Sequence, residues 1–479
     1  MAEDTPNPIL EEEEDWYRDH LATVDEHGKR VWIYPKKPKG KFTNYRTIVA
    51  LFLLVVLFGM PWVKVHGNPL FMFNILERKF ILFGSYFPPQ DFHLFVLAMI
   101  IMVIFIALFT VIYGRLFCGW VCPQTIFMES VYRKIEYWIE GDANAQRRLN
   151  NAPWNGEKLL KKVSKQIIFF AIAVLVANTF LSYIIGVDQV INIIKDPISE
   201  HFQGFIAMIA FSFAFYGVFS FLREQVCTTI CPYGRLQGVL LDKNSVVITY
   251  DYLRGEPRGK IHKAVKGKEE EAAKMNALLG DCIDCKLCVQ VCPTGIDIRN
   301  GTQLECVNCT ACIDACDEVM TKVNRPTGLI RYDSEEGVRT GVKKIMNPRS
   351  IAYTSVLGVL VLLEIILFAT RTQVEGLLLR TPGMLYQKTD DGYISNLYNY
   401  QFVNKTSDTL ALDMELIDLE GRIKWVGQSP IAIPNDVTNG AVFIELPKSE
   451  LVAGKNRIKL RIRSGDHVVD QVKTSFMAP

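Results

Sequence analysis

The chain contains the stretch CIDCKLCVQVCP at residues 282–293 and the stretch CVNCTACIDAC at residues 306–316. Each stretch has three cysteines separated by two residues, and a fourth cysteine follows after three more residues. This spacing is typical of ferredoxins with two [4Fe-4S] clusters, in which the fourth cysteine of one run ligates the cluster of the other run. The predicted ligands of the first cluster are Cys282, Cys285, Cys288 and Cys316. The predicted ligands of the second cluster are Cys306, Cys309, Cys312 and Cys292.

Zinc is the alternative metal for so many cysteines. Zinc modules usually have two separated cysteine pairs with a longer spacer, whereas each run here has three closely spaced cysteines and a fourth. The spacing therefore favours iron-sulfur clusters and indicates that the protein moves electrons. The second run departs from the bacterial ferredoxin pattern at Asp317, where a proline usually stands. This departure removes no ligand.

Five long apolar stretches interrupt the 479-residue chain. They occupy roughly residues 47–65, 93–113, 166–186, 204–222 and 351–369. Each is close to the ~20 residues that a helix needs to cross ~30 Å of hydrocarbon. Burial inside a soluble protein is excluded because the first two stretches have no polar face at the helical period. The sequence predicts an integral membrane protein with five spanning helices.

The basic residues between the spans predict the orientation of the chain. Residues 115–165 contain nine lysines and arginines, whereas residues 187–203 contain Lys195 alone. Basic residues stay preferentially on the cytoplasmic side. The N-terminus and all twelve cysteines are therefore predicted to be cytoplasmic, where thiols stay reduced, and the C-terminal region is predicted to be periplasmic. The acidic residues 11–15 do not resemble a cleaved signal peptide and predict a solvated tail.

The first four spans form two similar hairpins. Each hairpin ends in an arginine followed by the pattern Cys-x3-Cys-Pro, at residues 115–123 in the first and 223–232 in the second. The repeat predicts two pseudo-symmetric halves that each bring two cysteines to the inner membrane face. Each proline suits the first position of a new helix. An amphipathic helix along the membrane interface is predicted after Pro123, from the apolar residues Ile126, Met128, Val131, Ile135 and Trp138.

The candidate catalytic and metal-binding residues of these hairpins are Cys118, Cys122, Cys227 and Cys231. If the segments around them are helical, positions i and i+4 share a face, so each pair could bind one metal. Four thiolates suit a soft ion such as Cu(I), zinc, or an additional iron-sulfur cluster, and the residues do not choose among these. Nearby basic residues are expected to favour the thiolate form, namely Arg115, Arg223 and Arg235.

Two other readings of these four cysteines stay open. They could be inert buried cysteines that pack as small apolar side chains, or they could form a reversible dithiol/disulfide couple. The same spacing in both halves, at the same membrane depth, favours a shared site over simple packing.

Three histidines map to the outer ends of the spans, namely His66, His93 and His201. With the methionines near the same layer they could bind copper or haem. An interfacial histidine is more often simply hydrated or hydrogen-bonded. A ligand role for these histidines is therefore a secondary hypothesis.

The charge balance limits the possible partners. The formal net charge is +2, and the basic residues are accounted for by membrane topology rather than by a groove for a polyanion. No nucleic-acid partner is therefore expected. No G-x-G-x-x-G or Walker pattern occurs, so the electron donor is expected to be a separate molecule.

Composition divides the chain into domains. Residues 1–45 are predicted to be a cytoplasmic tail, and residues 46–239 an α-helical membrane domain with four spans. Residues 240–345 are predicted to form a cytoplasmic two-cluster ferredoxin-like domain, entered through a charged helical or mobile linker at residues 260–274. Residues 346–372 are the fifth transmembrane helix. The fold class is therefore multi-domain.

The last domain, residues 373–479, has a different period. Apolar and polar residues alternate there, as in Leu410 to Leu416 and Ile458 to Ile462, and turns separate the short runs. The pattern predicts a small periplasmic immunoglobulin-like β-sandwich. The domain has no cysteine, so a docking or structural role is expected.

These features together resemble the FixG/RdxA family, also called CcoG, which is the accessory protein of cbb3-type cytochrome c oxidase. The resemblance includes both Cys-x3-Cys-Pro motifs and the segments 254–259 (RGEPRG), 280–285 (GDCIDC), 292–299 (CPTGIDIR), 312–317 (CIDACD), 328–332 (GLIRY) and 404–406 (NKT). It covers essentially the whole chain after residue 30. Similar architectures serve nitrous-oxide and nitrate reductases, so fold alone does not determine the electron acceptor.

The resemblance implies a multi-pass protein of the bacterial inner membrane that reduces Cu(II) to Cu(I) for the copper centre of the oxidase. Because thiolates stabilise Cu(I), copper is expected to be reduced at or near the four hairpin cysteines. The implied partners are membrane lipid, copper chaperones or oxidase assembly factors, and an unknown electron donor. A homodimer is left open.

Two other functions also stay open. One is an electron-transfer subunit that feeds a periplasmic reductase. The other is an assembly scaffold whose clusters are structural or sense redox state.

Overall fold

The structure is a computed structural model, and it describes residues 22–25, 27–65, 67–75, 79–262, 269–342, 347–383, 385–389, 391–417 and 419–479. The chain forms two compact units. The first unit combines the residues up to Phe58 with Ile100–Thr179 and Asp196–Val359, and the second combines Gly59–Met99, Phe180–Lys195 and Leu360–Pro479.

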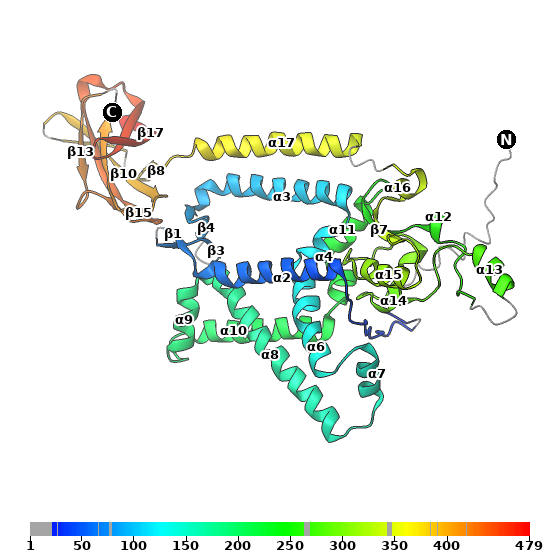
Figure 1. Ribbon diagram of the computed structural model, residues 1–479. Coiled ribbons are helices and arrows are strands. Elements are labelled where there is room, and N and C mark those ends of the chain that lie inside the picture. Colours follow the sequence, from blue (N-terminus) through cyan, green and yellow to red (C-terminus); the bar gives the residue numbers. More distant parts are fainter. Residues whose placement is uncertain are drawn as a thin grey trace. The chain divides into compact units, whose positions relative to one another are not determined.

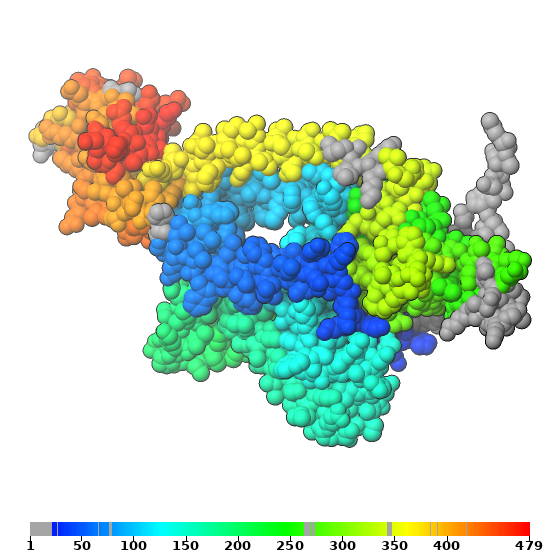
Figure 2. Space-filling view, viewed as in Figure 1, coloured from blue at the N-terminus to red at the C-terminus, as the bar shows by residue number. Residues whose placement is uncertain are grey.

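Five helices are long and apolar enough to cross a membrane, which confirms the predicted number of spans (Figure 1). They are α2 (Lys41–Gly59), α3 (Phe92–Tyr113), α8 (Gly156–Ile185), α10 (Phe202–Gly217) and α17 (Pro348–Ala369). No residue in the most apolar window of α17 is buried, and Figure 2 shows the exposed side of this helix in yellow. An apolar helix with so much exposed surface is stable in lipid and not in water. The chain is therefore a multi-pass membrane protein.

Helix α8 begins ten residues before the predicted start of the third span, at residue 166. The additional turns carry Glu157 and Lys161, which form an ion pair (2.6 Å) one helical turn apart. At 1.5 Å per residue, a helix of 30 residues is about 45 Å long, so its polar start extends beyond the hydrocarbon. The apolar run predicted the span but not the helical turns ahead of it.

Short helical segments follow each of the two hairpins. After the first they are α4 (Leu116–Trp120), α5 (Pro123–Thr125), the π-helical turn η3 (Ile126–Tyr132), α6 (Arg133–Ile139) and α7 (Ala143–Asn151). After the second they are the π-helical turns η4 (Val218–Leu222) and η5 (Val226–Ile230), followed by α11 (Pro232–Leu240). The segment predicted to be an amphipathic helix is helical. Its Phe127 and Tyr132 pack against Phe169 of α8 and Phe219 of η4, and Trp138 is 80% exposed.

The ferredoxin region of the first unit is built on one antiparallel strand pair, β6 (Val247–Tyr250) with β7 (Ile330–Asp333). Its helical elements are α12 (Tyr252–Gly255), α13 (Glu269–Ala277), α14 (Leu287–Gln290), η6 (Ile298–Asn300), α15 (Ala311–Lys322) and α16 (Glu335–Thr340). Part of the predicted linker is the helix α13, while residues 263–268 lie outside the described residues. Isoleucines from the strands and turns form the core together with Met320 and Leu329.

The second unit contains the small sheet β3–β4–β5 and a two-sheet β-sandwich. The small sheet and its neighbours are β1 (Lys64–Val65), β2 (Asn68–Pro69), β3 (Phe71–Asn74), β4 (Lys79–Leu82), β5 (Ser85–Phe87) and helix α9 (Val187–Lys195). The sandwich packs the sheet β13-β15-β10-β8, with β9 on β10, against the sheet β12-β16-β17. The pair β11 and β14 completes it.

The sandwich strands follow the predicted alternation. Their bounds are β8 (Val374–Arg380), β9 (Gln387–Lys388), β10 (Tyr393–Asn404), β11 (Leu410–Ala411), β12 (Asp413–Leu416), β13 (Arg422–Trp425), β14 (Ile431–Ala432), β15 (Val437–Pro447), β16 (Gly454–Ser464) and β17 (His467–Ala478). In β16 the buried residues Ile458, Leu460 and Ile462 alternate with charged residues. Their apolar side chains form the core between the two sheets.

Buried ion pairs attach the sandwich to the membrane-proximal part of the second unit. The Asp91 carboxylate, just ahead of α3, lies 2.7 Å from Arg371 and 2.7 Å from Lys405. Lys405 also pairs with Glu375 of β8 at 3.0 Å. Because Asp91 and Lys405 are almost fully buried, loss of either partner would leave an uncompensated charge.

Candidate iron-sulfur and thiol site

Two cavities in the first unit are lined by the cysteines of the ferredoxin runs. We call them cavity one and cavity two. The cysteines in the wall of cavity one are Cys282, Cys285, Cys288 and Cys316. The cysteines in the wall of cavity two are Cys292, Cys306, Cys309 and Cys312, with Cys288 between the two cavities. The fold thus brings together the two sets of four that the spacing predicts.

The backbone winds around each cavity in the same way. Asp284 and Lys286 flank the second cysteine of the first run, and both have positive φ (49° and 55°). Asn308 and Thr310 occupy the same places in the second run, with φ of 52° and 66°. Asp and Asn tolerate this left-handed conformation, whereas Lys and Thr adopt it only when the surroundings impose it. The third cysteine of each run then follows in the first turn of α14 or α15.

Burial controls the charge of these thiols. It raises the pKa of Cys306 and Cys316 to about 12 and that of Cys309 to about 11, and neighbouring cysteines add to the effect. Backbone N–H groups counter it in part, as those of Asn308 and Ala311 do for Cys306 and Cys309. The thiols alone stay neutral at neutral pH, and thiolates form when a metal centre supplies positive charge. Four cysteine sulfurs around one cavity, with backbone N–H groups beside them, fit a [4Fe-4S] cluster in each cavity.

The two cavities differ in their polar surroundings. Lys286 and Arg299 line cavity one, and Arg299 forms ion pairs of 2.6 Å with Asp284 and with Asp297. Cys285 in this wall is exposed. The wall of cavity two contains no charged residue among the described lining residues, and its cysteines are buried or half-buried. Cavity one is therefore the more exposed and more polar of the two among the described residues.

The hairpin motifs have a different local geometry from the predicted one. Cys118 lies in α4 and Cys227 in η5, but Cys122 and Cys231 are the N-cap residues of α5 and α11. The two cysteines of each motif therefore do not share one continuous helix, and the expectation of an i, i+4 helical face is wrong. The prolines do occupy the first turn of the new helices, as predicted. Each proline breaks the preceding helix, because the residue before a proline is disfavoured in the helical conformation.

The four hairpin thiols lie near one another, and we call them the four-thiol junction (Cys118, Cys122, Cys227 and Cys231). Burial raises the pKa of Cys227 to about 12, and charges on Cys122, Cys118 and Cys231 raise it further. Burial likewise raises the pKa of Cys118 to about 11, against the opposing effect of Arg115. Arg115 therefore acts on the thiol as predicted, but burial outweighs it.

The other two predicted arginines have different positions. Arg223 is almost fully buried, forms an ion pair with Glu136 and lies over the ring of Trp32. Arg235 has an exposed side chain. Neither is among the main charges acting on the junction thiols.

The sequence did not point to two residues beside the junction, Gln237 and Thr110. The Cys118 thiol donates a hydrogen bond to Gln237 Oε1 (3.0 Å), which also accepts one from Arg115 Nε (3.1 Å). Gln237 is fully buried and donates from Nε2 to the Thr110 hydroxyl (3.4 Å). The sequence signal for each was a polar residue among apolar ones. Gln237 stands five residues after Pro232, and Thr110 stands within the second span.

The junction is more open than a site for a single tetrahedral ion. At a Zn–S distance of ~2.3 Å, four sulfurs around one ion lie less than ~4 Å apart. In the described part of the chain, the group of three or more possible ligands found within 4.8 Å of one another is Asp196, Glu200 and His201, without any cysteine. To bind a single tetrahedral ion, the junction sulfurs would have to move closer together. At their present spacing they suit a metal centre with more than one ion.

The structure describes two of the three predicted histidine ligands, His201 in the first unit and His93 in the second. His201 Nε2 lies 3.0 Å from Asp196 Oδ2, at the start of α10. His93 lies in the first turn of α3. His66 lies outside the described residues.

The four-thiol junction is in direct contact with the loop of cavity two. A Cβ atom on Gly119 would lie 2.5 Å from the Val307 carbonyl oxygen and 2.6 Å from that of Asn308, so only glycine permits this approach. The Trp120 indole N–H donates to the Tyr332 hydroxyl (3.1 Å), which donates to the Asn308 carbonyl (3.2 Å). Cys118, Cys309 and their apolar neighbours share one buried cluster.

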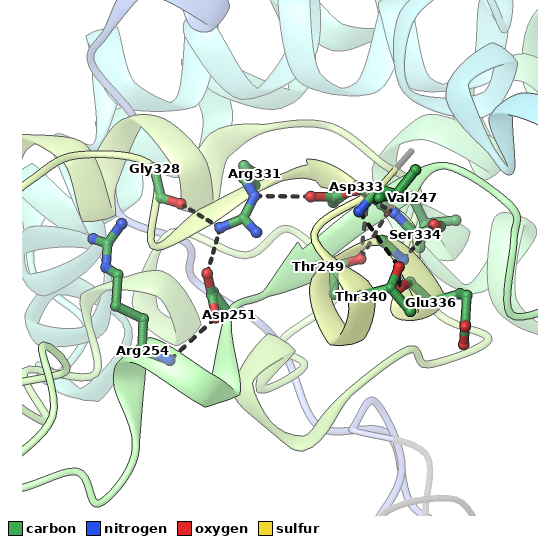
Figure 3. Close-up of polar contacts among 12 residues, drawn as sticks. Val247, Thr249, Asp251, Arg254, Gly328, Arg331, Asp333, Ser334, Glu336 and Thr340 are labelled. Carbon is green, nitrogen blue, oxygen red and sulfur yellow. Dashed lines mark hydrogen bonds and ion pairs between the residues drawn. The ribbon is translucent and has the colours of Figure 1, made fainter. Parts of the chain in front are cut away.

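Strand β7 holds Tyr332 at this contact. The preceding residue of the strand, Arg331, binds the carboxylates of Asp251 (2.6 Å) and Asp333 (2.9 Å), as Figure 3 shows. Ser334 accepts the N–H of Gly337 and starts α16 immediately afterwards. The strand pair is thereby clamped at both ends, and Tyr332 stays in register opposite Ile248.

Three family models match parts of this chain. Residues 222–335 match the family model described as "4Fe-4S dicluster domain", and residues 95–141 match one described as "4Fe-4S binding domain". Residues 365–479 match one described as "IG-like fold at C-terminal of FixG". The protein is therefore a membrane-bound iron-sulfur protein with a C-terminal immunoglobulin-like domain.

Its relatives identify the family. The chain is 30% identical to Protein RdxB of Cereibacter sphaeroides over 91% of its own length and 93% of that protein. It is 35% identical to Nitrogen fixation protein FixG of Rhizobium meliloti over 64% of its length, and 33% identical to Protein RdxA of Cereibacter sphaeroides over 64%. These two alignments span 57% and 63% of FixG and RdxA. The chain belongs to the FixG/RdxA family.

One solved structure is also similar in part. The crystal structure of a FixG-related protein from Vibrio parahaemolyticus aligns with 22% of this chain and 97% of its own, at 17% identity and a TM-score of 0.18. A score this low supports no inference about the fold.

Proposed function

We propose that this protein reduces Cu(II) to Cu(I) at the four-thiol junction, with electrons that an external donor delivers to the ferredoxin region. The Cu(I) produced serves the assembly of the copper centre of cbb3-type cytochrome c oxidase. The established part of this account is an iron-sulfur electron-transfer protein of the FixG/RdxA family. Copper as the substrate and the oxidase as the destination are the proposal.

The observation that carries the proposal is the contact between the four-thiol junction and the loop of cavity two. Gly119, between the first two junction cysteines, touches the carbonyls of Val307 and Asn308, between two cysteines of cavity two. Two cysteine-rich segments about 190 residues apart in the sequence would not need a backbone contact this close if the junction cysteines only filled space. The contact supports a redox function for the junction.

We assign the ligand sets of cavities one and two to the eight cysteines predicted from the spacing. A [4Fe-4S] cluster held by four thiolates accepts and gives one electron at a time, which matches the one-electron reduction of Cu(II). The residues around cavity two bury Cys292 and Cys306 and donate backbone N–H groups to them. Arg299 fixes the two loops beside cavity one through its ion pairs.

The junction residues suit Cu(I) better than Cu(II). Thiolates are soft ligands, so a site that binds the product more tightly than the substrate favours reduction. Copper binding replaces the thiol protons, and Arg115 lowers the cost of the resulting negative charge on Cys118. Gln237 accepts the Cys118 S–H hydrogen bond and orients this thiol before copper arrives.

The proposed location is the bacterial inner membrane, with the N-terminus and ferredoxin region in the cytoplasm and the β-sandwich in the periplasm. The distribution of basic residues supports this orientation. The cysteine-free sandwich then faces the compartment in which copper chaperones or oxidase assembly factors would dock.

The test uses full-length protein purified without oxygen. Iron and sulfide analysis and EPR first measure cluster content, and Cu(II) is then added to the reduced protein with a chromogenic Cu(I) chelator. We expect one Cu(I) for each electron stored. The matched control is a variant with serine at all four junction positions, which should keep its clusters and lose most of the copper reduction. Clusters that fill but never discharge into Cu(II) would contradict the proposal and favour an electron-transfer subunit for another reductase.

A further inference from the structure

A basic pocket lies where the first span begins, apart from the cysteine sites. Its walls are the chain from Lys37 to Thr47 and residues Glu129 to Tyr137 of η3 and α6, both in the first unit. Its volume is about 460 Å³, which lies within the range of ~300–1,000 Å³ of small-molecule sites. The pocket is therefore large enough for a ligand of the size of a phosphate ester.

The lining carries a clear excess of positive charge. Its basic side chains are Lys37, Lys39, Arg46 and Lys134. Its one carboxylate, that of Glu129, is already paired with Arg133 at 2.9 Å. Within the described residues, none of the four basic side chains forms an ion pair at 4.0 Å or less. The pocket therefore holds four basic side chains that have no ion-pair partner in the part of the chain that the structure describes.

Two of these side chains show the effect of the missing counter-ion. Burial and the nearby charges of Arg46 and Lys37 lower the pKa of Lys134. Arg46 Nη1 donates to the Cys309 carbonyl (3.4 Å), while its buried Nη2 has no hydrogen-bond partner among the described residues. Buried donors are normally satisfied, so this guanidinium has capacity for an anion.

The helix N-terminus in the pocket is not the anion site. Asp314 accepts hydrogen bonds from the backbone N–H groups of Phe42 (3.1 Å) and Thr43 (2.7 Å) at the start of α2. Gly40 makes room for it, because a Cβ atom there would lie 2.3 Å from the Asp314 side chain. The dipole of α2 is thus already compensated, and an additional anion has to be held by the lysines and Arg46.

The location determines the class of ligand. Lys41 is the first residue of the span Lys41–Trp62, so the pocket lies at the level of the lipid headgroups. Residues 36–46 contain five lysines and arginines and no acidic residue. Basic pockets next to a transmembrane helix bind phosphate-bearing headgroups. This departs from the sequence prediction that the basic residues set the topology without forming a groove.

We propose that this basic pocket binds a phosphate-bearing anion, with Lys37, Lys39, Arg46 and Lys134 as its ligands. The phosphate can belong to an anionic phospholipid or to a free phosphate compound. Because Arg46 also holds the Cys309 carbonyl, the bound anion lies next to the loop of cavity two. The site is independent of the copper reaction and can be tested without it.

The test variant replaces Lys37 and Lys134 together by glutamine (K37Q/K134Q), since neither side chain supports the fold through an ion pair with a described residue. Arg46 is left in place because it contacts the cysteine loop. The matched control removes the same charge from two exposed lysines of the sandwich (K448Q/K455Q), which line no part of the pocket. Both variants and the unmodified chain are purified at full length in detergent.

Binding of phosphatidylglycerol and of phosphatidylcholine is measured by native mass spectrometry, and inorganic phosphate is tested by its effect on thermal unfolding. Each basic residue near an anionic headgroup contributes about fivefold to binding, so K37Q/K134Q should bind phosphatidylglycerol about 25-fold more weakly than the unmodified chain and the control. Stabilisation by inorganic phosphate that K37Q/K134Q loses and the control keeps, without a lipid preference, would support the site with a free phosphate as ligand. Equal lipid binding by all three proteins without stabilisation by phosphate, or an equal loss in both variants, would overturn the proposal.

Discussion

Cavity one and cavity two each collect four cysteines of one predicted ligand set and have the same backbone conformation, but their surroundings differ. Cavity one has the exposed Cys285 and the charged residues Lys286 and Arg299 in its wall. Cavity two has an apolar wall, and its loop touches the four-thiol junction through Gly119 and Tyr332. The repeated motif thus builds two similar sites. Cavity one has an exposed cysteine in its wall, whereas the loop of cavity two contacts the hairpin that carries the four-thiol junction.

This difference suggests a direction for the reaction. A donor can reach the side of cavity one, while the side of cavity two adjoins the thiols proposed to bind copper. The two sites should therefore respond differently to equivalent substitutions.

The largest effect is expected from single ligand substitutions in the two cavities. Cys285→Ser and Cys312→Ser should each remove one cluster and about half of the iron, because a cluster needs one thiolate for each iron. After chemical reduction, the Cys285→Ser protein should still reduce Cu(II), and the Cys312→Ser protein should not. Iron and sulfide analysis with a Cu(I) chelator assay checks both. Equal copper reduction by the two variants would remove the proposed difference between the cavities.

The next effect is expected from Gly119→Ala. The added methyl group would collide with the Val307 carbonyl at 2.5 Å and push the junction away from cavity two. Overpacking of this kind costs about 1–3 kcal/mol in stability, and a misplacement of about 1 Å can reduce a rate by about 100-fold. Gly358→Ala in α17 is the matched control, because nothing lies within 4 Å of its Cβ position. A Gly119→Ala protein with a normal copper reduction rate and normal stability would show that the close contact is not needed.

A pH effect should report the burial of the thiols in both cavities when the metal is absent. Cys306 has a folded-state pKa of about 12, above the ~8.5 of a free cysteine, so its contribution to stability is complete below pH ~8.5 and is lost as the pH rises toward 12. Metal-free protein should therefore lose stability between pH ~8.5 and 12, by about 1.4 kcal/mol per pH unit for each such thiol. Denaturant unfolding at several pH values measures this slope. Cys306→Ser should make the slope smaller, and an unchanged slope would contradict the assignment.

The smallest effect is expected from the tyrosines beside the two cavities. Tyr332→Phe removes the hydroxyl between Trp120 and Asn308 and should cost about 1 kcal/mol, with a change in the fluorescence of Trp120. Tyr250→Phe, in the wall of cavity one, removes a hydrogen bond to Glu256 (3.2 Å) and serves as the comparison. Copper reduction should slow in the first variant and not in the second. The opposite order would place the electron exit at cavity one.

Much of this molecule could be predicted from the sequence, since strong local patterns determine it. The five apolar runs predict the five helices because a helix satisfies all its backbone hydrogen bonds within one segment of about 20 residues in lipid. The alternation around Ile458 and Leu460 predicts the strands of the sandwich. The cysteine spacing predicts which four cysteines meet in each cavity, and the structure brings these sets together.

The remaining features depend on contacts between distant segments. Nothing near Gln237 in the sequence shows that it accepts hydrogen bonds from Cys118 and Arg115, more than 100 residues away. The side-by-side placement of Gly119 and Val307 likewise appears only when the hairpin meets the ferredoxin region. The helical face expected for each Cys-x3-Cys pair was wrong because the following proline breaks the helix at the second cysteine.

Stopped-flow mixing of reduced, oxygen-free protein with Cu(II) tests the central claim most directly. The absorbance of the iron-sulfur centres is followed in the unmodified chain and in the variant with serine at Cys118, Cys122, Cys227 and Cys231. We predict rapid reoxidation with formation of Cu(I) in the unmodified chain, and reoxidation at least about tenfold slower in the variant despite an equal iron content. Equal rates in the two proteins would contradict the account, because copper would then take its electrons without the four-thiol junction.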